Sequence, residues 1–198
     1  GHAYLTFAAH QYLRSQGMAV KVIGIDVRTA ARDRNNEIAQ QLGISSSIEF
    51  RAEEIADTTL ASADIAIALH ACDTATDDAI AWAINSDAKL ALIAPCCHHD
   101  IQAQMHEAPE PWSIITRNGI MKERLGDLLT DGLRMQIMKL RGYRVEAIEF
   151  IGGEHTPRNL MIRAVKTGAG ADASEKQKYD QMLALWKVKP ALASLIKG

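Results

Sequence analysis

The chain has 198 residues, a length that suits one domain, or one domain with a small appendage. Apolar residues make up 47% of it, and the formal net charge of −2 argues against a domain that holds nucleic acid by charge alone. No apolar run reaches about 18 residues and no charged-then-apolar leader stands at the start, so we expect neither a membrane span nor a secretory signal.

Short apolar strands alternate with helical patterns over most of the chain. The predicted elements are, in chain order, a helix over 4–16, a strand over 20–26, a helix over 29–42, a strand over 47–51, a short helix, a strand over 63–69, a helix over 74–85, a strand over 88–94, a less regular stretch over 100–123, a helix over 124–141, strands over 143–151 and 159–166, and a helix over 174–197 broken near Pro190.

This order predicts an α/β fold. Strands that alternate with helices indicate βαβ units and a mostly parallel, doubly wound sheet, and the last two strands form an antiparallel hairpin. We expect one domain over 1–167, a linker over 168–173 and a C-terminal helical segment over 174–198. The chain enters its first helix with no strand before it, so we expect a protein cut just inside a glycine-rich loop, unless Gly1-His2 is a cloning remnant.

Asp26 ends the second strand of such a layout, about 20 residues after a glycine turn. An acid at this point accepts hydrogen bonds from the ribose hydroxyls of a nucleotide-like cofactor. The alternative is a cap for the helix that begins near Thr29. Glu53, after the strand over 47–51, is a candidate for contact with the edge of an adenine ring, or it merely favours a helix start.

Two reactive runs follow the strands over 63–69 and 88–94. They are His70-Ala71-Cys72-Asp73 and Pro95-Cys96-Cys97-His98-His99, and they contain all three cysteines. Ligands gather outside the carboxyl ends of parallel strands, so we expect the chemistry here. An odd number of cysteines, two of them adjacent, indicates free thiols or metal ligands in a reducing, cytoplasmic setting.

Three interpretations of these runs compete. A metal site would suit zinc, although the spacing matches no standard finger. A proton-transfer or substrate-orienting site would use the histidines, with His70 or His98 as a general base. A buried turn would need only small apolar side chains, since cysteine is readily buried. We favour the second, assign no metal ligand and keep zinc as an alternative.

These runs, together with Tyr4-Leu5-Thr6-Phe7 at the first helix entry, resemble class I S-adenosylmethionine-dependent methyltransferases. The similarity is to the methyltransferase-like proteins related to rRNA adenine dimethylases and covers about 1–166. The Cys96–His99 run also resembles tRNA 2′-O-methyltransferases of the acceptor stem, in which Arg-Cys follows the histidines where Asp100-Ile101 stands here.

The resemblance implies a Rossmann-like methyltransferase fold whose first strand is missing from this chain. It implies catalytic or substrate-facing roles for one group of residues and contact with S-adenosylmethionine for another. The first group is His70, Asp73, Cys96, Cys97 and His98. The second is Gly1, Tyr4, Asp26, Glu53, Leu69 and His70.

The expected function is methyl transfer to an oxygen or nitrogen atom of an RNA or another nucleophilic substrate. One alternative is a catalytically inactive methyltransferase-like binding module. Another is an NAD-dependent oxidoreductase, which would share Asp26 but which the terminal hairpin disfavours. The sequence does not fix the oligomeric state; open strand edges would favour self-association.

Overall fold

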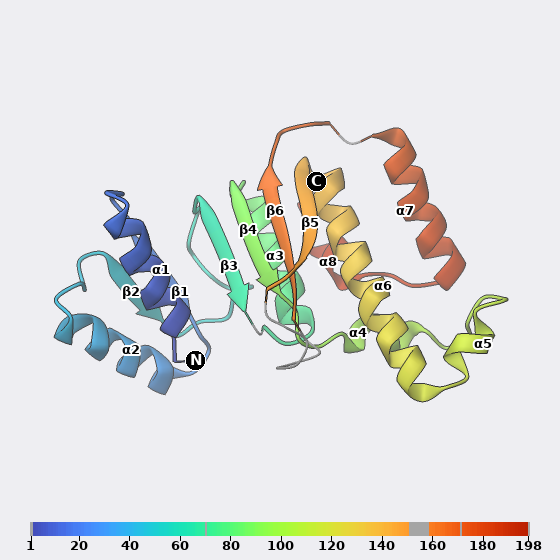
Figure 1. The fold of residues 1–198 in the computed structure, drawn as a ribbon, viewed down its shortest axis with the longest axis horizontal. Helices are drawn as coiled ribbons and strands as arrows, with labels where there is room; N and C mark the ends of the chain where they lie inside the picture. Colours follow the sequence, from blue (N-terminus) through green and yellow to red (C-terminus); the bar gives the residue numbers. More distant parts are fainter. Residues whose placement is uncertain (1, 70, 151–158, 171, 198) are drawn as a thin grey trace. The chain divides into compact units, whose positions relative to one another are not determined.

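The structure is a computed structural model, and it describes residues 2–69, 71–150, 159–170 and 172–197. The chain divides into two compact units, Gly1–Thr59 and Leu60–Gly198 (Figure 1). Each unit carries its own strands and its own apolar cluster. Among the described residues, no helix is both long and apolar enough to cross a membrane.

The first unit is a small αβαβ arrangement. Its elements are α1 (Tyr4–Ser15), β1 (Val22–Ile25), α2 (Thr29–Gln41) and β2 (Ile48–Arg51). The two strands pair in parallel, with Val22 opposite Ile48 and Ile25 opposite Arg51. Ala39, Ile48 and Phe50 form its buried cluster. The Asn36 side chain donates to the Phe50 carbonyl and accepts from its amide, both at 2.9 Å, and so ties α2 to β2.

The second unit is built on a four-stranded sheet in the order β3, β4, β6, β5 (Figure 1). Strands β3 and β4 are parallel, whereas β6 runs antiparallel to both β4 and β5. Its elements are β3 (Ile65–Leu69), α3 (Thr74–Asn85), β4 (Leu90–Ala94), α4 (His99–Gln104), α5 (Ser113–Thr116), α6 (Gly119–Leu140), β5 (Tyr143–Glu149), β6 (Leu160–Lys166), α7 (Ala173–Trp186) and α8 (Ala191–Leu195).

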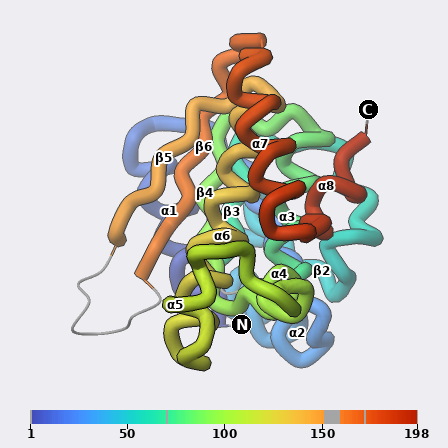
Figure 2. The backbone as a smooth tube through the Cα atoms, turned by 90° about the vertical axis from the view of Figure 1, so that its right-hand side faces the viewer, coloured from blue at the N-terminus to red at the C-terminus, as the bar shows by residue number. Residues whose placement is uncertain are grey.

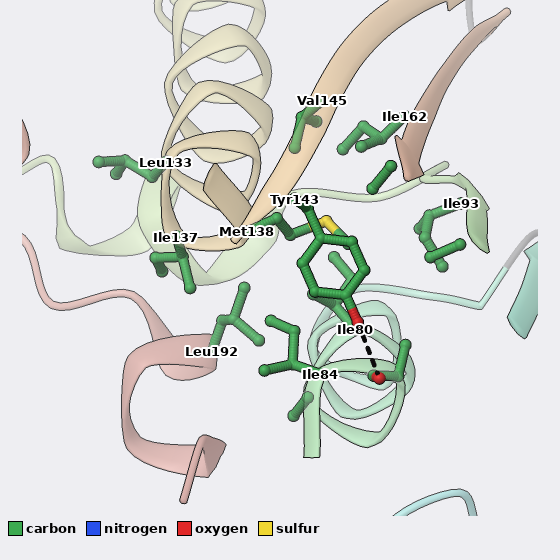
Figure 3. Packing of buried hydrophobic residues seen from close by; sticks show 14 of the residues in the cluster. Ile80, Ile84, Ile93, Leu133, Ile137, Met138, Tyr143, Val145, Ile162 and Leu192 are labelled. Atoms are coloured by element: carbon green, nitrogen blue, oxygen red, sulfur yellow. Dashed lines mark hydrogen bonds between the residues drawn. The ribbon is translucent and has the colours of Figure 1, made fainter. Parts of the chain in front are cut away.

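One face of this sheet is covered by helices. Alternate residues of each strand point into the cluster over part of its length, including Ala91 and Ile93 of β4, and the apolar stripes of α3 and α6 complete it. Tyr143 lies near the centre, among Ile80, Ile84 and Met138 (Figure 3). Its hydroxyl donates to the Ala88 carbonyl at 2.8 Å, with the Ala83 carbonyl 3.2 Å away, so this buried polar atom is satisfied.

The C-terminal helices belong to the same cluster. In Figure 2, α7 and α8 lie on the helical side of the second unit, α7 beside α6 and α8 beside α3. Trp186 and Leu192 are their fully buried anchors. On the opposite face of the sheet, Ile65 and Ile67 of β3 are exposed.

The predicted α/β class is confirmed, and so are the antiparallel pairing of the last two strands and the break between α7 and α8 at Pro190. Three local expectations are wrong. No helix follows β2, because the chain makes a turn over 55–57 and Glu53 accepts a hydrogen bond from Thr58. The stretch over 100–123 contains α4 and α5. Helix α6 begins at Gly119, five residues before the predicted start. Ile120 and Met121 in its first turn are exposed, so no apolar stripe marks this part of the helix in the sequence.

Candidate functional site

Asp26 stands directly after β1, at the carboxyl end of the parallel pair in the first unit. Its amide donates to the Arg51 carbonyl at 3.1 Å, which extends the pairing by one residue. Its carboxylate accepts from the backbone amide, the Nε and the Nη2 of Arg28, each at 3.0 Å. These hydrogen bonds from Arg28 hold the pKa of Asp26 well below its usual range. The carboxylate is therefore an ionised acceptor at neutral pH.

Glu53 lies at the same edge of the first unit, two residues after β2, and is half-buried. One carboxylate oxygen, Oε1, accepts from the Thr58 hydroxyl at 2.6 Å. Tyr4 is the first residue of α1; its ring is exposed and stacks on His2, with the ring centroids 5.5 Å apart. A hollow beside this edge is lined by His2, Arg28, Ala30, Ala31 and Arg34. Gly1 lies outside the described residues.

The two reactive runs meet at the carboxyl ends of β3 and β4 in the second unit. Leu69, the last residue of β3, pairs with Ala94, the last of β4, so the segments that follow them emerge side by side. The Cys96 thiol is 3.8 Å from that of Cys72 and 3.7 Å from that of Cys97. His70, which was assigned to both the catalytic and the cofactor groups, lies outside the described residues.

The three thiols differ in exposure. Cys72 is exposed, whereas Cys96 and Cys97 are half-buried. Burial raises the pKa of Cys96 to about 12, and contacts with the other two thiols add to the rise. In the absence of a metal, Cys96 is thus a protonated thiol at neutral pH. This state disfavours a role as a nucleophile, which requires the thiolate.

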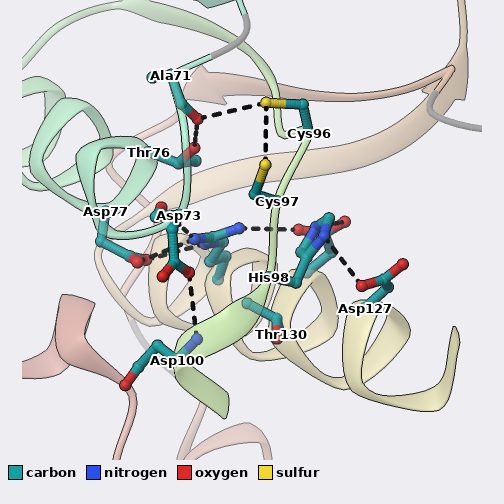
Figure 4. A network of polar contacts seen from close by, with 12 residues as sticks. Ala71, Asp73, Thr76, Asp77, Cys96, Cys97, His98, Asp100, Asp127 and Thr130 are labelled. Carbon is teal, nitrogen blue, oxygen red and sulfur yellow. Dashed lines mark hydrogen bonds and ion pairs between the residues drawn. The ribbon is translucent and has the colours of Figure 1, made fainter. Parts of the chain in front are cut away.

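His98 is buried between two carboxylates of α6 (Figure 4). Its Nδ1 lies 3.2 Å from Asp127 and its Nε2 lies 2.9 Å from Asp131. With 4% of its side chain exposed, His98 anchors the run after β4 to α6 rather than facing solvent.

Arg134 joins this cluster to the run after β3. Its Nε and Nη2 donate to the two carboxylate oxygens of Asp77, both at 2.9 Å, and its Nη1 donates to Asp131 at 3.2 Å. Its Nη2 also donates to the Asp73 carbonyl at 3.0 Å. Although burial opposes the charged form, the hydrogen bonds to Asp77 raise the pKa of Arg134. It remains a cation inside the unit.

Asp73 occupies a strained turn between β3 and α3, with a φ of 50° and a ψ of −117°. Three contacts hold it. Its carbonyl accepts from Arg134, its carboxylate accepts from the Asp100 amide at 3.2 Å, and its other carboxylate oxygen lies 4.0 Å from His99. Strained backbone of this kind collects at functional sites, where the surrounding structure supports it. The Asp73–Asp100 bond also ties the two runs together.

Most of this network escaped the sequence analysis. Asp77, Asp127, Asp131 and Arg134 are not among the site residues that the sequence predicts. A signal was nevertheless present, because Arg134 lies within the apolar stripe of α6, beside Leu133 and Ile137. A charged residue in such a stripe must find buried partners.

The comparison with known families gives one match. A family model described as a methyltransferase domain matches residues 1–104, slightly more than half of the chain. The matched range contains Asp26, Glu53 and both reactive runs. No curated protein matches the chain significantly.

Proposed function

Because the chain belongs to this family of methyltransferase domains, we propose that it transfers a methyl group from S-adenosylmethionine to an oxygen or nitrogen atom of its substrate. When bound, the cofactor would supply a methyl group attached to a sulfonium sulfur: the substrate nucleophile would bond to the methyl carbon as the carbon–sulfur bond breaks, and S-adenosylhomocysteine would leave. Catalysis of such a step depends mainly on how the reacting atoms are positioned, with a modest contribution from removal of a proton.

The observation that carries the proposal is the ionised Asp26 at the carboxyl end of β1. A carboxylate in this place accepts hydrogen bonds from two ribose hydroxyls. The residues fit the cofactor on one condition. Arg28 now donates to both carboxylate oxygens and is itself exposed, so its side chain must turn toward solvent when the ribose binds.

We assign the other cofactor contacts by position. Glu53 would meet the adenine edge, because it lies at the same edge of the first unit as Asp26. Tyr4, at the start of α1, belongs to the same unit as Asp26, whereas Leu69, Gly1 and His70 are proposed from the sequence alone.

We propose that the substrate approaches the ends of β3 and β4, where Asp73, Cys96 and Cys97 gather. The burial of His98 supports a positioning role for it, since it holds the run after β4 against α6. Removal of a proton from the acceptor is then proposed for His70, which follows β3 directly in the sequence.

RNA is the substrate class that we propose, on the resemblance of the Cys96–His99 run to RNA methyltransferases. The net charge of −2 means that a local basic patch must hold it. We propose a cytoplasmic setting on the ground that the three cysteines form no disulfide, whereas oxidising compartments favour disulfides.

The test is transfer of label from methyl-tritiated S-adenosylmethionine into total RNA, with Asp26→Ala as the variant and Asp33→Ala as the control. Asp33 is an exposed acid on α2 that pairs with Arg32. We expect nuclease-sensitive label with the unaltered chain and with Asp33→Ala, and little with Asp26→Ala. If the chain binds S-adenosylhomocysteine but labels neither RNA nor any other fraction, it is a binding module and not an enzyme.

A further inference from the structure

All three cysteines of the chain gather at one point of the second unit, although they come from two separate segments. Their sulfur atoms all lie within 4.8 Å of one another. The proposed methyl transfer assigns these thiols a place beside the substrate but no chemical step. Burial alone does not explain why three thiols gather, because Cys72 is exposed.

The spacing of the sulfurs can be compared with that of a metal-bound set. Zinc binds thiolate sulfur at about 2.3 Å in tetrahedral sites, which places two sulfurs of one zinc about 3.8 Å apart. The Cys72–Cys96 and Cys96–Cys97 sulfur pairs are separated by 3.8 and 3.7 Å. Two of the three sulfur–sulfur distances in the cluster therefore already match those of a zinc site.

A disulfide fits this arrangement less well. Its sulfurs lie about 2.05 Å apart, so the Cys72 and Cys96 sulfurs would have to approach by roughly 1.7 Å. It would also leave the third thiol without a role. A tetrahedral metal ion would bind all three sulfurs, and the Cys72–Cys96 and Cys96–Cys97 sulfur pairs would move little.

Hydrogen bonds and ion pairs hold the backbone on both sides of the thiols. The Thr76 hydroxyl donates to the Ala71 carbonyl at 2.5 Å, just before Cys72. On the other run, Cys97 precedes His98, which is fixed between Asp127 and Asp131 (Figure 4). The Asp73–Asp100 hydrogen bond joins the two runs beyond the thiols. Supports of this kind orient metal ligands and reduce the cost of ordering them.

We propose that Cys72, Cys96 and Cys97 bind one zinc ion or a similar thiophilic divalent ion, with the fourth position open to water or to a substrate atom. Three S–H bonds break and three zinc–sulfur bonds form, the protons pass to solvent, and no atom is oxidised or reduced. Three protein ligands and one open position are the pattern of catalytic rather than structural zinc sites. The exposure of Cys72 places the cluster within reach of solvent.

The test is titration of the reduced, metal-stripped chain with cobalt(II), followed by competition with zinc. We expect thiolate-to-cobalt charge-transfer absorption that saturates at one ion per chain and is abolished by zinc. Cys72→Ser, Cys96→Ser and Cys97→Ser should each weaken binding at least tenfold. His99→Ala, which removes an exposed neighbouring imidazole, should leave the affinity unchanged.

The cobalt titration of the unaltered chain tests the proposed site even if a cysteine variant fails to fold. Absence of charge-transfer absorption in the folded, reduced chain would overturn the proposal. Loss of binding in His99→Ala would overturn the three-thiol ligand set. The result is independent of methyl transfer, because the absorption reports the ligands whether or not the chain is active.

Discussion

Replacing Arg134 with methionine tests whether the buried ionic network organises the candidate site. The substitution leaves Asp77, which has 5% of its side chain exposed, without its two-point partner, and it removes one partner of Asp131. Removing one member of a buried ion pair costs about 3–5 kcal/mol, because the remaining charge stays buried without compensation. We expect the free energy of unfolding, measured by urea denaturation with circular dichroism, to fall by about this amount.

Arg163→Met is the matched control. Arg163 pairs with Glu146 at 2.8 Å, but both side chains are more than 40% exposed, and such pairs contribute about 0–1 kcal/mol. In a second variant, Arg134→Met with Asp77→Leu, the buried charge is removed with its partner, and we expect recovery of about 2 kcal/mol or more. A loss below about 1 kcal/mol for Arg134→Met, equal to that of the control, would refute the reasoning.

Two further predictions concern single packing positions. Burial raises the pKa of Tyr143 to about 12, so the folded state holds the phenol proton more tightly than the unfolded state does. The resulting contribution to the unfolding free energy is fully present below about pH 10 and is lost as the pH rises to 12. Tyr143→Phe should therefore flatten the alkaline fall in unfolding free energy, and an unchanged profile would contradict this. A Cβ atom at Gly24 would overlap the Phe50 ring, so Gly24→Ala should lower the unfolding free energy of the first unit by about 1–3 kcal/mol in a urea titration. The control is Gly132→Ala on α6, where a Cβ atom meets open space and the change should be neutral or stabilising. Equal effects of the two substitutions would contradict the packing argument.

The strands and their sequence along the chain were predictable because they depend on local patterns. The runs over 63–69 and 88–94 are apolar, short and bounded by polar turns, and each contains an observed strand. The meeting of Cys72 with Cys96 followed from the same logic, since parallel neighbours end at one edge.

The polar network was not predictable in the same way, because its partners are far apart in the chain. Arg134 and Asp77 are 57 residues apart, and no pattern in the sequence around either residue identifies the other as its partner. The sequence signals only that Arg134 lies in an apolar stripe and needs a partner. Likewise, the pairing of Asp26 with Arg28 depends on a turn whose geometry composition does not reveal.

The most direct test of the account is calorimetric titration of S-adenosylhomocysteine into the unaltered chain, Asp26→Ala and Asp33→Ala. Hydrogen bonds to a charged acceptor contribute about 1.5–3 kcal/mol, so loss of Asp26 should weaken binding at least about tenfold. The account predicts saturable one-to-one binding by the unaltered chain and by Asp33→Ala. Full affinity in Asp26→Ala, or saturable binding of NADH in place of S-adenosylhomocysteine, would contradict it.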